Sequence, residues 1–191
     1  MSVVEKIENL VENECRKDSN IFGYEIWPYH IVPAVKCAKE LAKRLNADQE
    51  IVEIAALLHD IASIRHGDPQ NHHVRGMDDA QEILTALDYP QDKIEKVKHC
   101  ILAHRGSKTV KRRTMEAECV ASADAMAHFC NIPALLHLTF VKQGMNVEEG
   151  AKSTLDKLER SWSKLIPEAK QIVKEKYEAA RLILSNQGRQ P

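Results

Sequence analysis

The run IAALLHDIA, residues 54–62, limits the possible folds most, because it is apolar on almost every side of a helix. Such a helix must be enclosed by other elements, so we expect a central helix from Ile51 to about Ile64, with Asp48 as its N-cap. The run also contains His59 and Asp60. Two adjacent polar groups are costly to bury unless they are hydrogen-bonded, paired or bound to a metal.

The rest of the chain also has apolar residues at helical spacing, and no segment alternates like a strand. Glycine and proline number only seven each, which favours helices over a turn-rich β fold. We therefore predict an all-α fold. The further expected helices lie near residues 4–11, 28–45, 74–87, 92–104 (started by Asp92) and 114–129 (capped by Thr114), with two or more amphipathic helices after residue 150. Residues 66–73 and 107–113 are expected loops.

The length and charge of the chain narrow its class. The 191 residues contain no internal repeat or linker, so a single domain over 1–191 is expected. The net charge of −1 predicts neither a nucleic-acid polymer nor a membrane surface as partner. The five cysteines form no CxxC motif and no signal peptide is visible, which indicates a reducing, cytoplasmic location.

Further polar residues occupy positions that suit a metal site. Asp124 lies inside the apolar run VASADAMA, and His30 begins the second expected helix. Imidazole and carboxylate ligands suit one or two divalent ions of Mn, Fe, Co, Ni, Zn or Mg. The candidate ligand set is therefore His30, His59, Asp60 and Asp124.

The order of these residues resembles the H…HD…D signature of the HD superfamily of metal-dependent phosphohydrolases. The matching segments are WPYHIVPAV, AALLHDIA, HHVRGMDDAQEIL, ILAHRG and EAECVASADAM. They span about residues 24–130, and the helices at about 131–185 are less distinctive. The resemblance implies an HD-type helical bundle whose metal is held by His30, His59, Asp60 and Asp124.

Many members of this superfamily bind a second metal through two more histidines. In this chain His72 and His104 match those positions, with His73 and His99 as alternatives, and Asp60 would bridge the two ions. His99 precedes His104 by five residues, about 140° around a helix, so both should not face one ion.

The resemblance also implies hydrolysis of a phosphoester or phosphoanhydride bond in a nucleotide or another small phosphorylated metabolite, by water that the metal activates. His59, Asp60 and His104 would be the catalytic residues. Basic side chains after His104 could bind phosphate oxygens, and the candidates are Arg105, Lys108, Lys111 and Arg112.

Two departures from the superfamily leave the substrate open. Relatives that act on nucleoside triphosphates often carry a second acidic residue where this chain has Ala127 or His128, and a basic residue where it has Pro33 and Ala34. His128, His66 and His137 are interpreted here as ordinary core or surface histidines.

Two other functions remain as alternatives. Some relatives with six such ligands hold two irons and use dioxygen to cleave small substrates. A non-catalytic module that binds a metal or nucleotide is the other alternative. The amphipathic C-terminal helices could also serve a homodimer.

Overall fold

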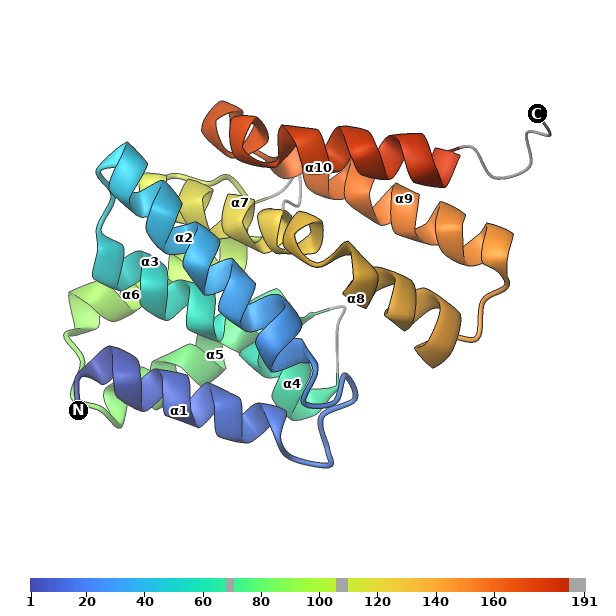
Figure 1. The fold of residues 1–191 in the computed structure, drawn as a ribbon. Helices are drawn as coiled ribbons and strands as arrows, with labels where there is room; N and C mark the ends of the chain where they lie inside the picture. The colour runs from blue at the N-terminus through green and yellow to red at the C-terminus, as the bar shows by residue number, and fades with distance from the viewer. Residues whose placement is uncertain (68–70, 106–109, 186–191) are drawn as a thin grey trace.

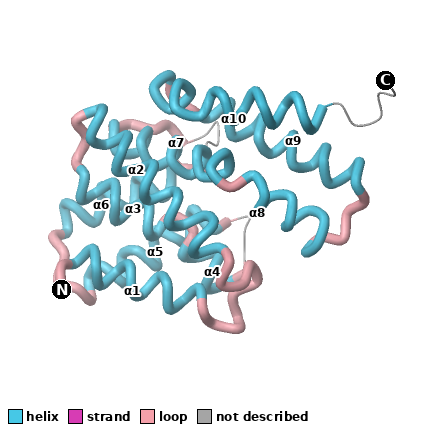
Figure 2. The backbone as a smooth tube through the Cα atoms, viewed as in Figure 1, coloured by secondary structure: helices cyan, strands magenta, loops and turns pink. Residues whose placement is uncertain are grey.

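The computed structural model describes residues 1–67, 71–105 and 110–185, and these form helices and loops with no strand (Figures 1 and 2). The all-α prediction is confirmed. The elements are α1 (Val3–Cys15), the π-helical turn η1 (Trp27–Ile31), α2 (Val32–Leu45), α3 (Gln49–Leu58), α4 (Ile61–His66), α5 (His72–Thr85), α6 (Gln91–Ala103), α7 (Met115–Cys130), α8 (Ile132–His137), the π-helical turn η2 (Leu138–Lys142), α9 (Val147–Lys164) and α10 (Pro167–Ser185).

The helix starts follow from local hydrogen bonds. An Asp48 carboxylate oxygen accepts from the backbone amides of Glu50 and Ile51 at 3.1 and 3.2 Å, and the Thr114 hydroxyl accepts from that of Ala117 at 3.2 Å. Both predicted N-caps are confirmed. The predicted start at Asp92 is wrong, because α6 begins at Gln91 after Pro90 and has no side-chain cap.

The predicted continuous helix from Ile51 to Ile64 is also wrong. It breaks after Leu58, and α4 begins at Ile61. Asp60 lies between the two helices with φ −108° and ψ 9°, in the bridge region of backbone space where many active-site residues lie. The break changes the direction of the Asp60 side chain relative to its neighbour, which a regular helix would fix at about 100°.

The helix α3 is the centre of the core, as its composition predicts. It contacts α1, α2, α6 and α7, and its residues Ile51, Ile54 and Leu58 are fully buried. The central position is confirmed, and it brings the end of α3 into the interior beside α7.

The C-terminal helices form a layer on one side of this bundle. Figure 1 shows α9 and α10 running side by side next to α7, and both helices contact it. The Phe129 ring packs edge-on against Trp162 of α9 and Tyr177 of α10, with centroids 6.4 and 5.9 Å apart. This aromatic cluster fixes α9 against α7.

Within the described residues, no single helix has both the length and the apolar composition needed to cross a membrane. The pair formed by Met115–Cys130 and Ile132–Lys142 passes such a test only when joined, across a bend of 77°.

A close approach at Gly150 gives a stability prediction. A β-carbon there would collide with the Phe140 ring. Alanine in a helix gains about 1 kcal/mol over glycine, but overpacking costs about 1–3 kcal/mol. We expect Gly150→Ala to lower the free energy of unfolding by about 1 kcal/mol, measured by urea denaturation. In a Phe140→Ala background the same change should stabilise the protein, and a destabilisation there would contradict the steric explanation.

Candidate metal centre

Four of the predicted ligands converge from three parts of the fold. His30 comes from η1, His59 and Asp60 from the break between α3 and α4, and Asp124 from the middle of α7. The His30 Nε2 atom lies 3.2 Å from His59 Nε2, 3.3 Å from an Asp60 oxygen and 3.6 Å from an Asp124 oxygen. We call this group the first cluster.

A second cluster lies on the other side of Asp60. His72, at the start of α5, and His104, at the end of α6, place their Nε2 atoms 3.0 Å apart. Asp60 Oδ1 lies 3.4 Å from His72 Nε2, whereas Asp60 Oδ2 lies 3.3 Å from His59 Nε2 in the first cluster. One carboxylate therefore faces both clusters, as the predicted bridging role requires.

The two alternative histidines lie outside these clusters. The His99 Nε2 atom accepts a hydrogen bond from the Arg113 backbone amide at 3.1 Å. The His73 ring stands edge-on to His72, and its Nδ1 atom is buried without a hydrogen-bond partner among the described residues. The structure thus brings together His72 and His104 rather than either alternative.

Backbone hydrogen bonds orient two of the imidazoles for cation binding. The Nδ1 atoms of His59 and His104 lie 2.8 and 2.5 Å from the carbonyl oxygens of Ala56 and Ile101. A carbonyl oxygen only accepts, so each Nδ1 carries a proton and each Nε2 is the ring nitrogen turned toward its cluster. Both Nε2 atoms face another imidazole at close range, and a divalent metal between the rings would fit this arrangement.

The electrostatics of the clusters keep the carboxylates ionised. Burial opposes ionisation of Asp60, but His59 and His30 outweigh it and hold its pKa well below the usual range. Burial also opposes the charged form of His59, but the Asp60 carboxylate raises the pKa of His59 to about 9. Burial and the nearby His59 lower the pKa of His104 to about 3. The Asp60 carboxylate is thus anionic and the His104 imidazole neutral, whereas a bound cation would have to displace the second proton of His59.

His128 joins the site although we interpreted it from the sequence as a core or surface histidine. Its ring stacks on His30 with centroids 5.1 Å apart, and its Nδ1 atom lies 3.1 Å from the Ser161 hydroxyl. His30, Asp124 and His128 offer ligand atoms within 4.8 Å of one another. The sequence signal is the spacing, because residues four apart, such as Asp124 and His128, share one face of a helix.

A cavity of about 870 Å³ opens above both clusters. Its base includes His30, Asp60, His72, His104 and Asp124. Its walls come from η1 and the segment before it, from α8, and from α9. A small molecule in this cavity would therefore meet the candidate metal ligands directly.

Of the predicted phosphate-binding residues that the structure describes, Arg105 alone lines the cavity. Lys108 falls outside the described residues. Lys111 is exposed and is not among the cavity residues. Arg112 donates hydrogen bonds to the Glu118 carboxylate and the Lys164 carbonyl oxygen, both at 2.9 Å, and so ties the loop to α7 and α9.

Comparison with known proteins gives a family match over the same region. The family model described as "HD domain" matches residues 29–128, which is more than half of the chain. An uncharacterized protein of Clostridium beijerinckii is 28% identical over 104 residues. That alignment covers 53% of this chain and 64% of the relative, a little under two thirds of the relative's length.

Solved structures are similar over nearly the whole chain. A structure described as an HD-superfamily hydrolase from Bacillus thuringiensis has a TM-score of 0.70 at 20% identity, covering 96% of this chain and 93% of that one. Bacillus subtilis YpgQ, crystallised in complex with ADP, has a TM-score of 0.69 at 19% identity, covering 97% and 98%. These similarities show a shared fold.

Proposed function

Because this chain belongs to the HD domain family, we propose that it is a metal-dependent hydrolase of a phosphoester or phosphoanhydride bond in a nucleotide or another small phosphorylated metabolite. The observation that carries the proposal is the pair of facing imidazole clusters that share Asp60 at the base of the cavity. Because α9 lines the same cavity, we also propose that residues 1–191 act as one domain.

The residues have separate roles in this proposal. His30, His59, Asp60 and Asp124 would hold one cation, and Asp60, His72 and His104 would hold another. A divalent cation bound there would lower the pKa of a coordinated water to about 7 and offset the charge that develops on a phosphoryl oxygen. Arg105 lines the cavity where it could bind a phosphate oxygen.

The ligand and the name recorded for two structural neighbours also support the proposal. YpgQ was crystallised with ADP, and the Bacillus thuringiensis neighbour is described as an HD-superfamily hydrolase. A nucleotide would suit the mixed lining here, in which aromatic and aliphatic side chains accompany charged ones.

The direct test is elemental analysis of the purified protein, followed by a screen for phosphate or pyrophosphate release with each candidate metal. Release from a phosphorylated metabolite that requires metal is the expected result. Bound iron with a mixed-valence signal in electron paramagnetic resonance and no release would instead favour the oxygenase alternative. Stoichiometric metal with no turnover of any kind would favour the binding module.

His104→Ala tests whether two ions bind. The side chain is buried and belongs to the second cluster alone. We expect the metal content to fall from about two equivalents per chain to about one, because the first cluster keeps its ligands. Inductively coupled plasma mass spectrometry measures this, and His99→Ala is the matched control. An unchanged content in His104→Ala would exclude the histidine as a ligand.

A further inference from the structure

One face of α9 carries a row of cationic side chains into the cavity. Lys157, Arg160 and Lys164 are spaced three and four residues apart, so they lie on the same side of the helix. All three line the cavity. Ser161, which is hydrogen-bonded to His128, lies among them and also lines the cavity. The row therefore faces the candidate metal centre.

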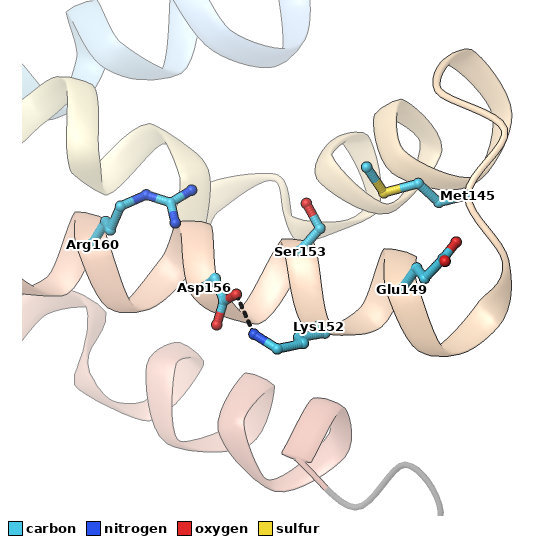
Figure 3. A pocket seen from close by; sticks show the side chains of 6 residues that line it. All are labelled: Met145, Glu149, Lys152, Ser153, Asp156 and Arg160. Carbon is cyan, nitrogen blue, oxygen red and sulfur yellow. Dashed lines mark hydrogen bonds and ion pairs between the residues drawn. The ribbon is translucent and has the colours of Figure 1, made fainter.

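Most of this row is not neutralised by the protein. Lys164 Nζ lies 3.4 Å from an Asp124 oxygen, but within the described chain Lys157 and Arg160 form no ion pair. Elsewhere on α9, Lys152 pairs with Asp156 at 2.6 Å. Figure 3 shows that pair on the lower side of α9 and Arg160 on its upper side. Lys157 is half-buried as well, so its unpaired charge is costly unless a ligand compensates it.

The charge of the whole cavity favours an anion. Among the residues that the structure describes, five cationic side chains and three carboxylates line it. Two of those carboxylates, Asp60 and Asp124, belong to the candidate metal clusters, so bound cations would offset them. The cations on α9 are then in excess, and they cannot be explained as partners for the acidic ligands alone.

The length of the row indicates what kind of anion fits. From Lys157 to Lys164 the helix rises by about 10 Å. Cations spread along two turns suit a chain of phosphates, whereas a single phosphate would need cations that converge on one point.

The cavity lining also includes apolar side chains. Ile26 and Tyr29 line the cavity next to the metal centre, and Leu135 and Leu138 line it from α8 and η2. Tyr29 is 51% exposed, so its ring is accessible to a ligand. Aromatic and aliphatic surfaces of this kind suit a planar organic group such as a base.

We propose that Lys157, Arg160 and Lys164 form a binding wall for the phosphates of an organic diphosphate or triphosphate, whose organic part lies against Tyr29, Leu135 and Leu138. This inference rests on the proposed function and narrows it, because it selects substrates with two or more phosphates over monophosphates.

Calorimetric titration of the metal-loaded protein tests the wall without relying on activity. The probes are AMP and a methylene-bridged analogue of ADP, which resists cleavage between its phosphates. We expect the ADP analogue to bind at least about tenfold more tightly than AMP, as one extra charged hydrogen bond would give. Lys157→Met and Arg160→Gln should each lower the affinity for the ADP analogue about tenfold. Each should lower the affinity for AMP by a smaller factor.

Lys152→Met is the matched control, because Lys152 lies on the same helix, is exposed and pairs outside the cavity. It should leave both affinities unchanged. Equal affinity for the two probes would contradict the proposal that α9 binds the phosphates. So would an unchanged affinity for the ADP analogue in the Lys157→Met, Arg160→Gln double variant. Phosphate release alongside such a result would leave the proposed function intact. Charge-dependent binding without any turnover would support the wall and reject the hydrolase.

Discussion

Asp60→Ala is expected to abolish both metal binding and turnover. The two oxygens of this carboxylate face different clusters, at 3.3 Å from His59 and 3.4 Å from His72, so its removal takes a ligand from each. We expect the rate of hydrolysis to fall on the order of a thousandfold or more, because the activated water and the electrostatic stabilisation are lost together. Metal content and phosphate release should be measured on the same preparation.

The matched control is Asp156→Ala, which removes a half-exposed carboxylate on α9 whose ion pair within the described chain is with Lys152. It should retain full metal content and activity. The midpoint of unfolding of Asp60→Ala should also be measured, so that loss of the fold is not mistaken for loss of the site. A folded, metal-free and fully active Asp60→Ala would rule out the metal-dependent mechanism.

Phe129→Ala is expected to have the largest effect on stability. The ring is 1% exposed and contacts both Trp162 and Tyr177, which themselves stack with centroids 4.1 Å apart. Truncation leaves a cavity between α7, α9 and α10, and we expect the free energy of unfolding to fall by about 3–5 kcal/mol. Urea denaturation followed by circular dichroism gives the value.

Phe129→Leu is the conservative comparison. It should lower the free energy of unfolding clearly less than Phe129→Ala does, because leucine fills most of the same volume. In the Trp162→Ala, Phe129→Ala double variant the loss in free energy of unfolding should be smaller than the sum of the two single losses, since the two rings share a contact. A midpoint unchanged by Phe129→Ala would mean that the aromatic cluster does not hold α9 on α7.

Polar residues in apolar surroundings singled out three of the predicted ligands. His59, Asp60 and Asp124 each interrupt a run of buried side chains, and burial of such groups requires partners. That argument does not say which partners; the set with His30 came from the resemblance to the H…HD…D signature, and the structure brings all four residues together. The identity of these residues as metal ligands stays a prediction until metal is measured.

The break before Asp60 could not be predicted in the same way. Every residue of IAALLHDIA tolerates a helix, so local preference favours continuity. Asp60 departs from the helix because His30 and His72, which come from other elements, surround its carboxylate. Tertiary contacts of this kind override local propensity.

The contribution of α9 was also hidden in the sequence. The segment DKLERSWSK has the mixed charges of a solvated helix face, and nothing local distinguishes Lys157 from Lys152. Tertiary contacts, among them the packing of Phe129 against Trp162 and the Ser161–His128 hydrogen bond, turn one side of the helix toward the cavity. Conversely, the basic stretch after His104 looked more promising, yet Arg112 is occupied by Glu118 and the Lys164 carbonyl.

The attachment of α9 to the bundle has a consequence for how such a protein can change. The candidate metal ligands lie between residues 30 and 124, whereas the row of cations lies on a separate helix, Val147–Lys164. If the proposed wall binds the phosphates, substitutions at Lys157 or Arg160 would alter which compounds are accepted and leave the candidate ligands in place, whereas Lys164 contacts Asp124 directly. Selectivity could then diverge from chemistry through those two positions on α9.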